Sequence, residues 1–222
     1  MLDTPLLLPT PLAVLKTLWR LARTVLFWRT VLVSLARILL GIALALIGGS
    51  LLALLTFKSP FLHHLFSPLL TLFKATPVAS IIIIIWILVG SINVPTAIAL
   101  LMVCPIIWQA TVEGLGSRKR DLDEVADIFG LSFKKRVKYI IIPRVIKNFM
   151  PALLTSVGLA WKSGIAAEII SVTKDSIGYY IKTNKDTFDA EYMFAWTGTV
   201  VIISLLFEFA IKRIARRIKP DA

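Results

Sequence analysis

Several apolar stretches of about twenty residues recur along this chain, and they constrain its fold more than any other feature. At a rise of 1.5 Å per residue, a helix of about twenty residues crosses a hydrocarbon core roughly 30 Å thick. The chain of 222 residues is 57% hydrophobic and only 17% charged, whereas soluble domains carry about 25% charged residues. Because helices satisfy their own backbone in lipid, we expect an all-α polytopic membrane protein.

We predict five transmembrane helices within a single domain that covers residues 1–222. Their approximate ranges are 31–56, 69–89, 94–112, 145–171 and 193–211. Residues 81–85 of the second are isoleucines, which would suit a strand, but an isolated strand cannot satisfy its backbone in lipid. Turn residues at 90–95 predict a hairpin between the second and third spans. Pro143 suits the first turn of the fourth.

The distribution of basic residues predicts the orientation. Segment 113–148 carries nine Lys or Arg residues and the C-terminal tail from Lys212 carries five, whereas segment 173–191 carries three against four acids. Since cytoplasmic loops collect Lys and Arg, the first two segments are expected in the cytoplasm. Five spans then place the N-terminus outside, where Lys16, Arg20, Arg23 and Arg29 would oppose the same rule.

Residues 12–28 offer two ways to reconcile these charges. Lys16, Arg20 and Arg23 lie at helical spacing opposite apolar residues such as Leu15 and Trp19, which predicts an amphipathic helix on the membrane surface. Alternatively the segment is a sixth span, with three charges that each cost about 2.5–3.5 kcal/mol when central. The surface helix is the favoured interpretation.

A polar segment, residues 118–143, separates the third and fourth spans. Asp121 suits a helix N-cap, and Glu124 can reach back to it. Gly130 permits a positive φ, so a second short helix can begin near Ser132. The segment is therefore expected to be a compact element whose apolar side can dock on another protein; this side is formed by Val125, Ile128, Phe129 and Leu131.

This segment resembles the EAA loop of the permease subunits of ATP-binding-cassette (ABC) importers. That motif reads Glu-Ala-Ala, three residues, Gly, and about nine residues later an apolar-x-apolar-Pro ending. Val125 replaces the first alanine of the motif, and the matching positions are Glu124, Ala126, Gly130, Ile140, Ile142 and Pro143. An ordinary charged loop is the alternative.

The resemblance implies a coupling loop that contacts the nucleotide-binding ATPase subunit. The implied residues are Asp121, Glu124, Val125, Ala126, Ile128, Phe129, Gly130 and Pro143. It further implies a prokaryotic inner-membrane location, two ATPase subunits that bind ATP and Mg²⁺, an extracytoplasmic solute-binding protein, and no cofactor on this chain. One chain with five spans is too small to enclose a solute path, which favours a homodimer, with a heterodimer as the alternative.

Other parts of the chain resemble the nitrate, sulfonate and taurine branch of these permeases. The matching features are Leu8–Pro11, Pro77, Trp86 followed by Gly90, Pro105, Gly158–Trp161 and Ala166–Glu168. Lys162 and Ser163 depart from the branch, where these positions are more often apolar. The resemblance implies a small anion, a sulfonate or a vitamin precursor as solute.

Six polar or amphipathic residues are candidates for the translocation path: Trp86, Asn93, Trp161, Lys162, Ser163 and Glu168. Charges within a span tend to face the bundle interior or a wet cavity, so Lys162 and Glu168 are expected to be buried. Being six positions apart, they do not share a helix face. For Lys162, guidance of an anion competes with a structural pair or a snorkelling lysine. Interfacial Trp and turn-forming Asn compete with path roles for the others.

No constellation of catalytic or metal-ligating residues is apparent. Cys104 is the only cysteine, and adjacent His63 and His64 are expected to be loop residues between the first two spans. The basic residues lie at span ends without interleaved aromatics, so nucleic-acid binding is not expected. Two other classes remain as alternatives: a lipid-modifying membrane enzyme that uses Lys162 and Glu168, and a secondary transporter, although no inverted repeat is visible.

Overall fold

The computed structural model describes residues 9–117 and 126–218, apart from the side chains of Lys74 and residues 214–218. Within these ranges the chain is helical, with no strand. The elements are α1 (Pro11–Ala22), α2 (Val25–Lys58), α3 (Pro60–Ala75), α4 (Val78–Val89), α5 (Val94–Gly116), α7 (Phe133–Arg136), the π-helix η1 (Val137–Ile141), α8 (Ile142–Ile170), α9 (Ile177–Asp186) and α10 (Ala190–Ile218). The predicted all-α membrane fold is confirmed.

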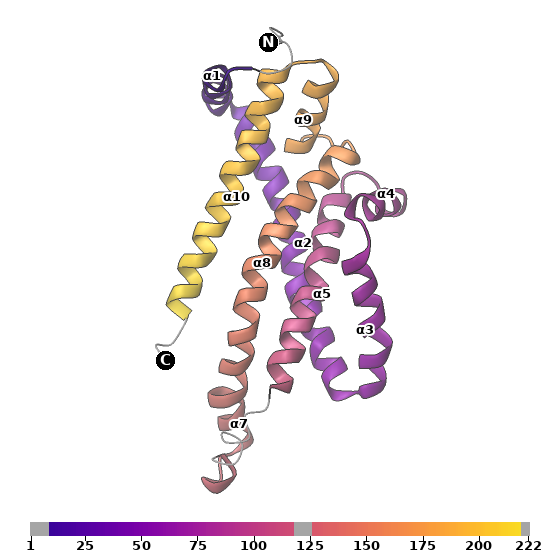
Figure 1. The fold of residues 1–222 in the computed structure, drawn as a ribbon, viewed down its shortest axis with the longest axis vertical. Helices are drawn as coiled ribbons and strands as arrows, with labels where there is room; N and C mark the ends of the chain where they lie inside the picture. The colour runs from indigo at the N-terminus through magenta and orange to yellow at the C-terminus, as the bar shows by residue number, and fades with distance from the viewer. Residues whose placement is uncertain (1–8, 118–125, 219–222) are drawn as a thin grey trace.

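The long helices run lengthwise, with α1 and α9 at one end and α7 at the other (Figure 1). We call these the α9 end and the α7 end. Among the described residues, four helical stretches are long and apolar enough to cross a membrane: Val25–Lys58, Val94–Gly116, Phe133–Ile170 and Ala190–Arg213. The pair α3 and α4 meets the same criterion only when counted together. The described residues therefore hold four candidate spans, or five if this pair is one crossing.

The centre of the bundle is α5, which packs between α2 and α8. One face of α2 carries a small residue at every fourth position: Gly41, Ala45, Gly49 and Ala53, all of them buried. A Cβ on Gly41 would lie 2.3 Å from the carbonyl oxygen of Thr96 on α5. On the other side of α5, a Cβ on Gly114 would lie 2.8 Å from the Cα of Val145 on α8. Small residues thus bring the backbones together, as is common between membrane helices.

The second predicted span, 69–89, is not one helix. The chain is bent by 107° between α3 and α4. Thr76 has an extended conformation, with ψ 135°, because a following proline disfavours the α region and Pro77 has no N–H to continue the helix. The helical chain also begins earlier than predicted, at Pro60, so His63 and His64 lie within α3 and not in a loop.

The predicted amphipathic helix 12–28 is shorter than expected. It ends at Ala22, because Thr24 takes an extended conformation and caps the next helix. The Thr24 hydroxyl accepts a hydrogen bond from the backbone N–H of Phe27 at 3.2 Å, a standard N-cap contact. The positions from Val25 to Trp28 therefore belong to α2.

The fourth predicted span begins earlier than Pro143. Elements α7, η1 and α8 form one helical stretch, Phe133–Ile170. Proline lacks an N–H and obstructs regular α-helical bonding. The π-helix η1 precedes Pro143 and accommodates it: the N–H of Ile142 bonds to the carbonyl of Val137. A rod thus joins the α7 end to the α9 end.

We predict that Gly41→Ala destabilises the protein because its new methyl group would overlap the Thr96 carbonyl. Overpacking of this kind costs about 1–3 kcal/mol. The control is Gly48→Ala on the same helix, whose new Cβ meets nothing within 4 Å. Thermal unfolding in one detergent should show a lower midpoint for Gly41→Ala only. Equal midpoints for the two variants would contradict the close α2–α5 packing.

Candidate functional site

The α7 end carries a compact turn, residues 126–136, which we call the tip. The N–H of Leu131 bonds to the carbonyl of Ala126 at 3.0 Å, and that of Gly130 bonds to the carbonyl of Asp127 at 3.1 Å. This pair of bonds is the Schellman pattern that ends a helix at a left-handed residue. Gly130 occupies that position with a φ of +58°. The tip therefore turns at Gly130 for a conformational reason.

Arg136 fastens the two limbs of the tip together. Its Nε donates to the carbonyl of Leu131 at 3.0 Å, and its Nη2 donates to the carbonyl of Ala126 at 3.2 Å. The same Nη2 pairs with the Asp127 carboxylate at 2.5 Å. Because the carboxylate is largely exposed, the fixed geometry matters more here than the charge energy. This role of Arg136 was not predicted from the sequence.

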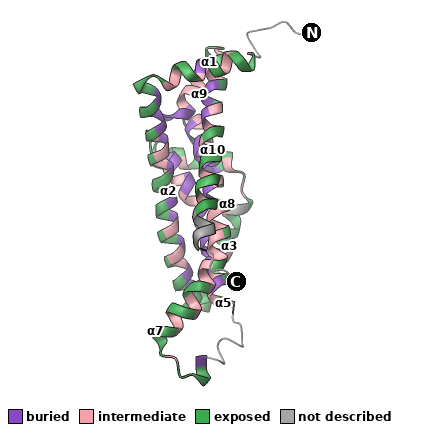
Figure 2. Cartoon of the chain, turned by 90° about the vertical axis from the view of Figure 1, so that its left-hand side faces the viewer, coloured by how far each residue is buried: buried purple, intermediate pink, exposed green. Residues whose placement is uncertain are grey.

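Much of the tip is exposed (Figure 2), and its exposed side chains include large apolar ones. Ile128, Phe129 and Phe133 are 80%, 75% and 77% exposed, whereas Ala126 is fully buried. Lys134 and Lys135 lie beside them and are exposed. The turn, fixed by Arg136, thus keeps three large apolar side chains exposed, and they form a surface suited to a partner protein.

Some of the coupling residues predicted from the sequence lie within the described ranges and others do not. Asp121, Glu124 and Val125 lie outside the described residues. The tip brings together Ala126, Ile128, Phe129 and Gly130. Pro143 is exposed on the rod, beyond η1.

Glu168 is the centre of a buried polar group toward the α9 end. Its side chain is fully buried, and its Oε2 accepts from the Ser34 hydroxyl and from the backbone N–H of Gly178, each at 3.0 Å. The Ser34 oxygen also accepts from the N–H of Ile177 at 2.9 Å. A carboxylate at the start of α9 is favourable because free N–H groups and the helix dipole meet there. Glu168 thus connects α2, α8 and α9.

Two further contacts extend this group, and we call the whole set the polar hub: Ser34, Arg37, Ser91, Glu168, Thr173 and Gly178. The Thr173 hydroxyl donates to the carbonyl of Ser91 in the α4–α5 turn at 2.8 Å. The Arg37 guanidinium donates to the carbonyl of Lys174 at 3.3 Å. The hub therefore joins four parts of the chain at one end of the bundle.

Sequence analysis predicted only Glu168 of the hub. Polar Ser34 and Arg37 within an apolar span are a usable signal, because such residues need partners in lipid. Gly178 gives no such signal in the sequence. In the structure, a Cβ at this position would lie 2.4 Å from the Cβ of Glu168. Val172 has a φ of +49°, an unfavourable conformation for a β-branched residue. The hub holds this strained turn in place.

Trp161 and Ser163 are packing residues within one chain. Trp161 is fully buried; its Nε1 donates to the carbonyl of Val200 on α10 at 3.0 Å, and its ring meets Phe207 edge-on. Ser163 is buried, and its hydroxyl donates to the carbonyl of Ala160 at 3.3 Å. Neither side chain is open to solvent or lipid in this arrangement.

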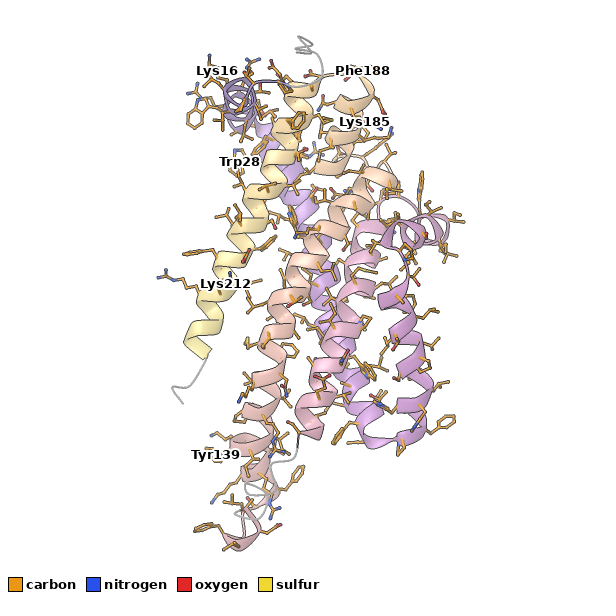
Figure 3. All side chains as sticks on the ribbon, viewed as in Figure 1. Lys16, Trp28, Tyr139, Lys185, Phe188 and Lys212 are labelled. Carbon is orange, nitrogen blue, oxygen red and sulfur yellow. The ribbon has the colours of Figure 1, made fainter. Side chains whose placement is uncertain are left out.

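The expectation that Lys162 is buried is wrong, since its side chain is exposed. Glu168 six positions later faces the core, so a rotation of about 240° turns Lys162 away from it. Lys162 lies within electrostatic range of Glu208 on α10. Glu208 pairs in turn with Lys212 at 2.5 Å, and both are exposed. The exposed side of α8 and α10 therefore carries two cations and one anion at span positions (Figure 3, Lys212).

Trp86 and Asn93 lie near the α4–α5 turn, and both are exposed. The Asn93 amide donates to the carbonyl of Val89 at 3.2 Å, which is ordinary turn chemistry. A cavity of about 500 Å³ lies between the α3–α4 bend, α5 and α8. Its apolar lining includes Phe73, Met102 and Leu159 but none of the six predicted path residues.

The described residues contain no group of three or more His, Cys, Asp or Glu side chains that could hold a metal ion. The His63 ring stacks on Trp108 at a centroid distance of 5.5 Å. Trp108 donates in turn to the Thr56 hydroxyl at 2.8 Å. His63 is thus a packing residue between α3 and α5.

Two relatives match almost the whole chain. The taurine transport system permease protein TauC of Escherichia coli (strain K12) is 24% identical over 226 residues, covering 99% of this chain and 82% of the relative. The formylaminopyrimidine transport permease protein ThiX of Halalkalibacterium halodurans is 26% identical, covering 99% of this chain and 88% of the relative.

The fold also matches a solved structure. The crystal structure of an amino acid ABC transporter with histidines aligns with a TM-score of 0.73 over 96% of this chain and 100% of that chain, at 16% identity. The family model for the binding-protein-dependent transport system inner membrane component matches residues 38–220. This match includes the tip, the rod and most of the polar hub. The chain therefore belongs to the family of binding-protein-dependent transport system inner membrane components, the permease subunits of ABC importers.

Proposed function

We propose that this chain forms part of a solute path across the prokaryotic inner membrane and couples that path to ATP hydrolysis by a partner. Two ATPase subunits would bind ATP and Mg²⁺, and this chain would supply no hydrolytic chemistry of its own. A second permease subunit, most simply a second copy, would complete the path. An extracytoplasmic binding protein would deliver the solute.

The observation that carries the proposal is the continuous helical stretch from the tip to the polar hub, which includes the π-helix η1 and Pro151. The rod, Phe133–Ile170, begins in the exposed apolar tip and contains Glu168 near its other end. A movement imposed on Phe129 and Phe133 by a partner would therefore be transmitted along one rigid element to the α9 end. Packed helices of this kind move as units because their interiors are close-packed.

The tip is proposed to face the cytoplasm, where an ATPase can reach it. The basic residues of the tip and the rod support this orientation, since cytoplasmic segments collect Lys and Arg. The α9 end would then face outward. Helices α1 and α9 both lie at this end of the bundle (Figure 1).

The function is tested by expressing this chain with its encoded ATPase and binding protein and reconstituting the purified complex in lipid. We expect the three to assemble and the solute-loaded binding protein to stimulate ATP hydrolysis. A chain that purifies without an ATPase and modifies lipid on its own would contradict the proposal and support the enzyme alternative.

The solute is proposed to be a small anion or sulfonate, with a vitamin precursor as the alternative. TauC and ThiX, named for taurine and formylaminopyrimidine transport, support both classes. The exposed Lys162 favours an anion, because two cations and one acid leave that side of α8 and α10 net positive. Thermal stabilisation of the binding protein across sulfonates, inorganic anions and pyrimidines would identify the solute.

We predict that Gly130→Val lowers the affinity of the ATPase subunit for this chain. A side chain at Gly130 meets nothing within 4 Å, so the penalty comes from the φ of +58° alone. Such strain costs about 1–3 kcal/mol in a β-branched residue, equivalent to a roughly 5- to 150-fold change in affinity.

The control is Gly130→Asn, because asparagine tolerates the left-handed region. Both variants should insert in the membrane, and ATPase retention during purification should fall for valine only. Equal retention in Gly130→Val and wild type would remove the turn from the mechanism.

We predict that Lys162→Met raises the half-saturating solute concentration about tenfold or more in proteoliposomes, if one charge contributes about 1.4 kcal/mol. Methionine keeps the length of the stem and removes the charge. Lys147→Met, which also changes an exposed lysine of α8, is the control.

Wild-type transport by Lys162→Met would contradict a solute role for this lysine. Loss of the assembled complex in this variant alone would assign Lys162 to structure instead.

A further inference from the structure

The helix α1 lies across the α9 end of the bundle, at a steep angle to the long helices (Figures 1 and 2). It is anchored there by its inner face. Thr17 is buried and its hydroxyl donates to the Glu191 carboxylate of α10 at 3.1 Å. Leu18 and Leu21 pack against the core. The orientation of α1 is therefore fixed by contacts with the rest of the chain.

A second face of α1 is apolar and exposed. Leu12, Leu15 and Trp19 follow one another at helical spacing and are 62%, 61% and 64% exposed. Trp28, at the start of α2, is 56% exposed and its Nε1 donates to the carbonyl of Ala22 at 2.8 Å. Exposed α2 residues such as Leu32 continue this apolar face along the span. Since α2 is long and apolar enough to cross a membrane, this face is suited to contact with lipid.

A third face carries positive charge beside the apolar one. Lys16 and Arg20 are one helical turn apart, and both are exposed, as is Arg23 at the end of α1. The Arg23 guanidinium lies 4.9 Å from the centre of the Trp19 ring. A membrane surface that contacts Trp19 would therefore also contact Arg23. Among the described residues, Glu191 is an acid that contacts α1, and its carboxylate accepts a hydrogen bond from Thr17. In this part of the structure, three exposed cations thus lie on α1 and at its end.

We propose that this helix is a binding site for the phosphate headgroups of anionic phospholipids at the α9 end of the membrane. Lys16, Arg20 and Arg23 would bind the phosphates, while Leu15 and Trp19 enter the acyl boundary. Basic side chains at a lipid surface contribute about 1 kcal/mol each, and tryptophan prefers this depth. The site also accounts for basic residues at the end of the bundle opposite the tip (Figure 3, Lys16 and Trp28). It does not depend on the transport function.

The experiment measures contact between Trp19 and lipid in nanodiscs that hold the full chain. Each disc contains phosphatidylcholine with an equal fraction of either brominated phosphatidylglycerol or brominated phosphatidylcholine, and the fluorescence difference between wild type and Trp19→Phe isolates Trp19. We expect the anionic lipid to quench at least about twofold more strongly, and the excess to shrink in high salt.

The variant Lys16→Gln/Arg20→Gln/Arg23→Gln should lose the additional quenching of Trp19 by phosphatidylglycerol but keep the quenching by phosphatidylcholine. Lys185→Gln, an exposed cation at the same end on α9, should leave the excess intact. Equal quenching by the two lipids in wild type would overturn the proposal without any variant. Absence of quenching by either lipid would also overturn it and would indicate that protein covers α1.

Discussion

The hydrocarbon core of a membrane offers no hydrogen bonds, so each polar group within it must be satisfied by the chain itself. One oxygen of the Glu168 carboxyl group, Oε2, meets this requirement with the Ser34 hydroxyl and the N–H of Gly178, whereas the buried Oε1 has no hydrogen-bond partner among the described residues. One buried side chain thus determines how α8 meets α2 and where α9 begins. Removing one partner of a buried polar group is expensive, because the remaining group then loses the hydrogen bond that compensates its desolvation. The architecture of the α9 end depends on this group.

The two ends of the bundle use different physics. At the α9 end, backbone and side-chain hydrogen bonds close the strained turn around Val172. At the α7 end, Arg136 braces a turn that leaves Phe129 and Phe133 exposed. The rod between them passes Pro143 by a π-helix and remains one helical stretch. An element that is buried at one end and open at the other is well suited to carry a movement from a partner into the bundle.

The sequence predicted the class of fold well because apolar length is a direct consequence of bilayer thickness. It also predicted the turn at Gly130 and that Lys162 and Glu168 do not share a helix face, since both follow from local geometry, but it wrongly placed Lys162 in the interior. It did not predict the bend at Thr76, although Pro77 carried the signal. The partners of Glu168 could not be predicted, because Ser34 and Gly178 are brought to it only by packing between distant helices.

The proposed coupling requires the rod to move as a rigid unit, and a distance measured within the rod shows whether it does. Spin labels at positions 135 and 159, both exposed and both on the rod, in one copy of a Cys104→Ala chain, would report the length of the rod within the assembled transporter. Pulsed electron resonance should give a narrow distance distribution that is the same with and without ATP. When ATP binds, the distance between labels at position 135 of the two permease copies should shorten. A distance within one copy that broadens or shifts when ATP binds would contradict the account.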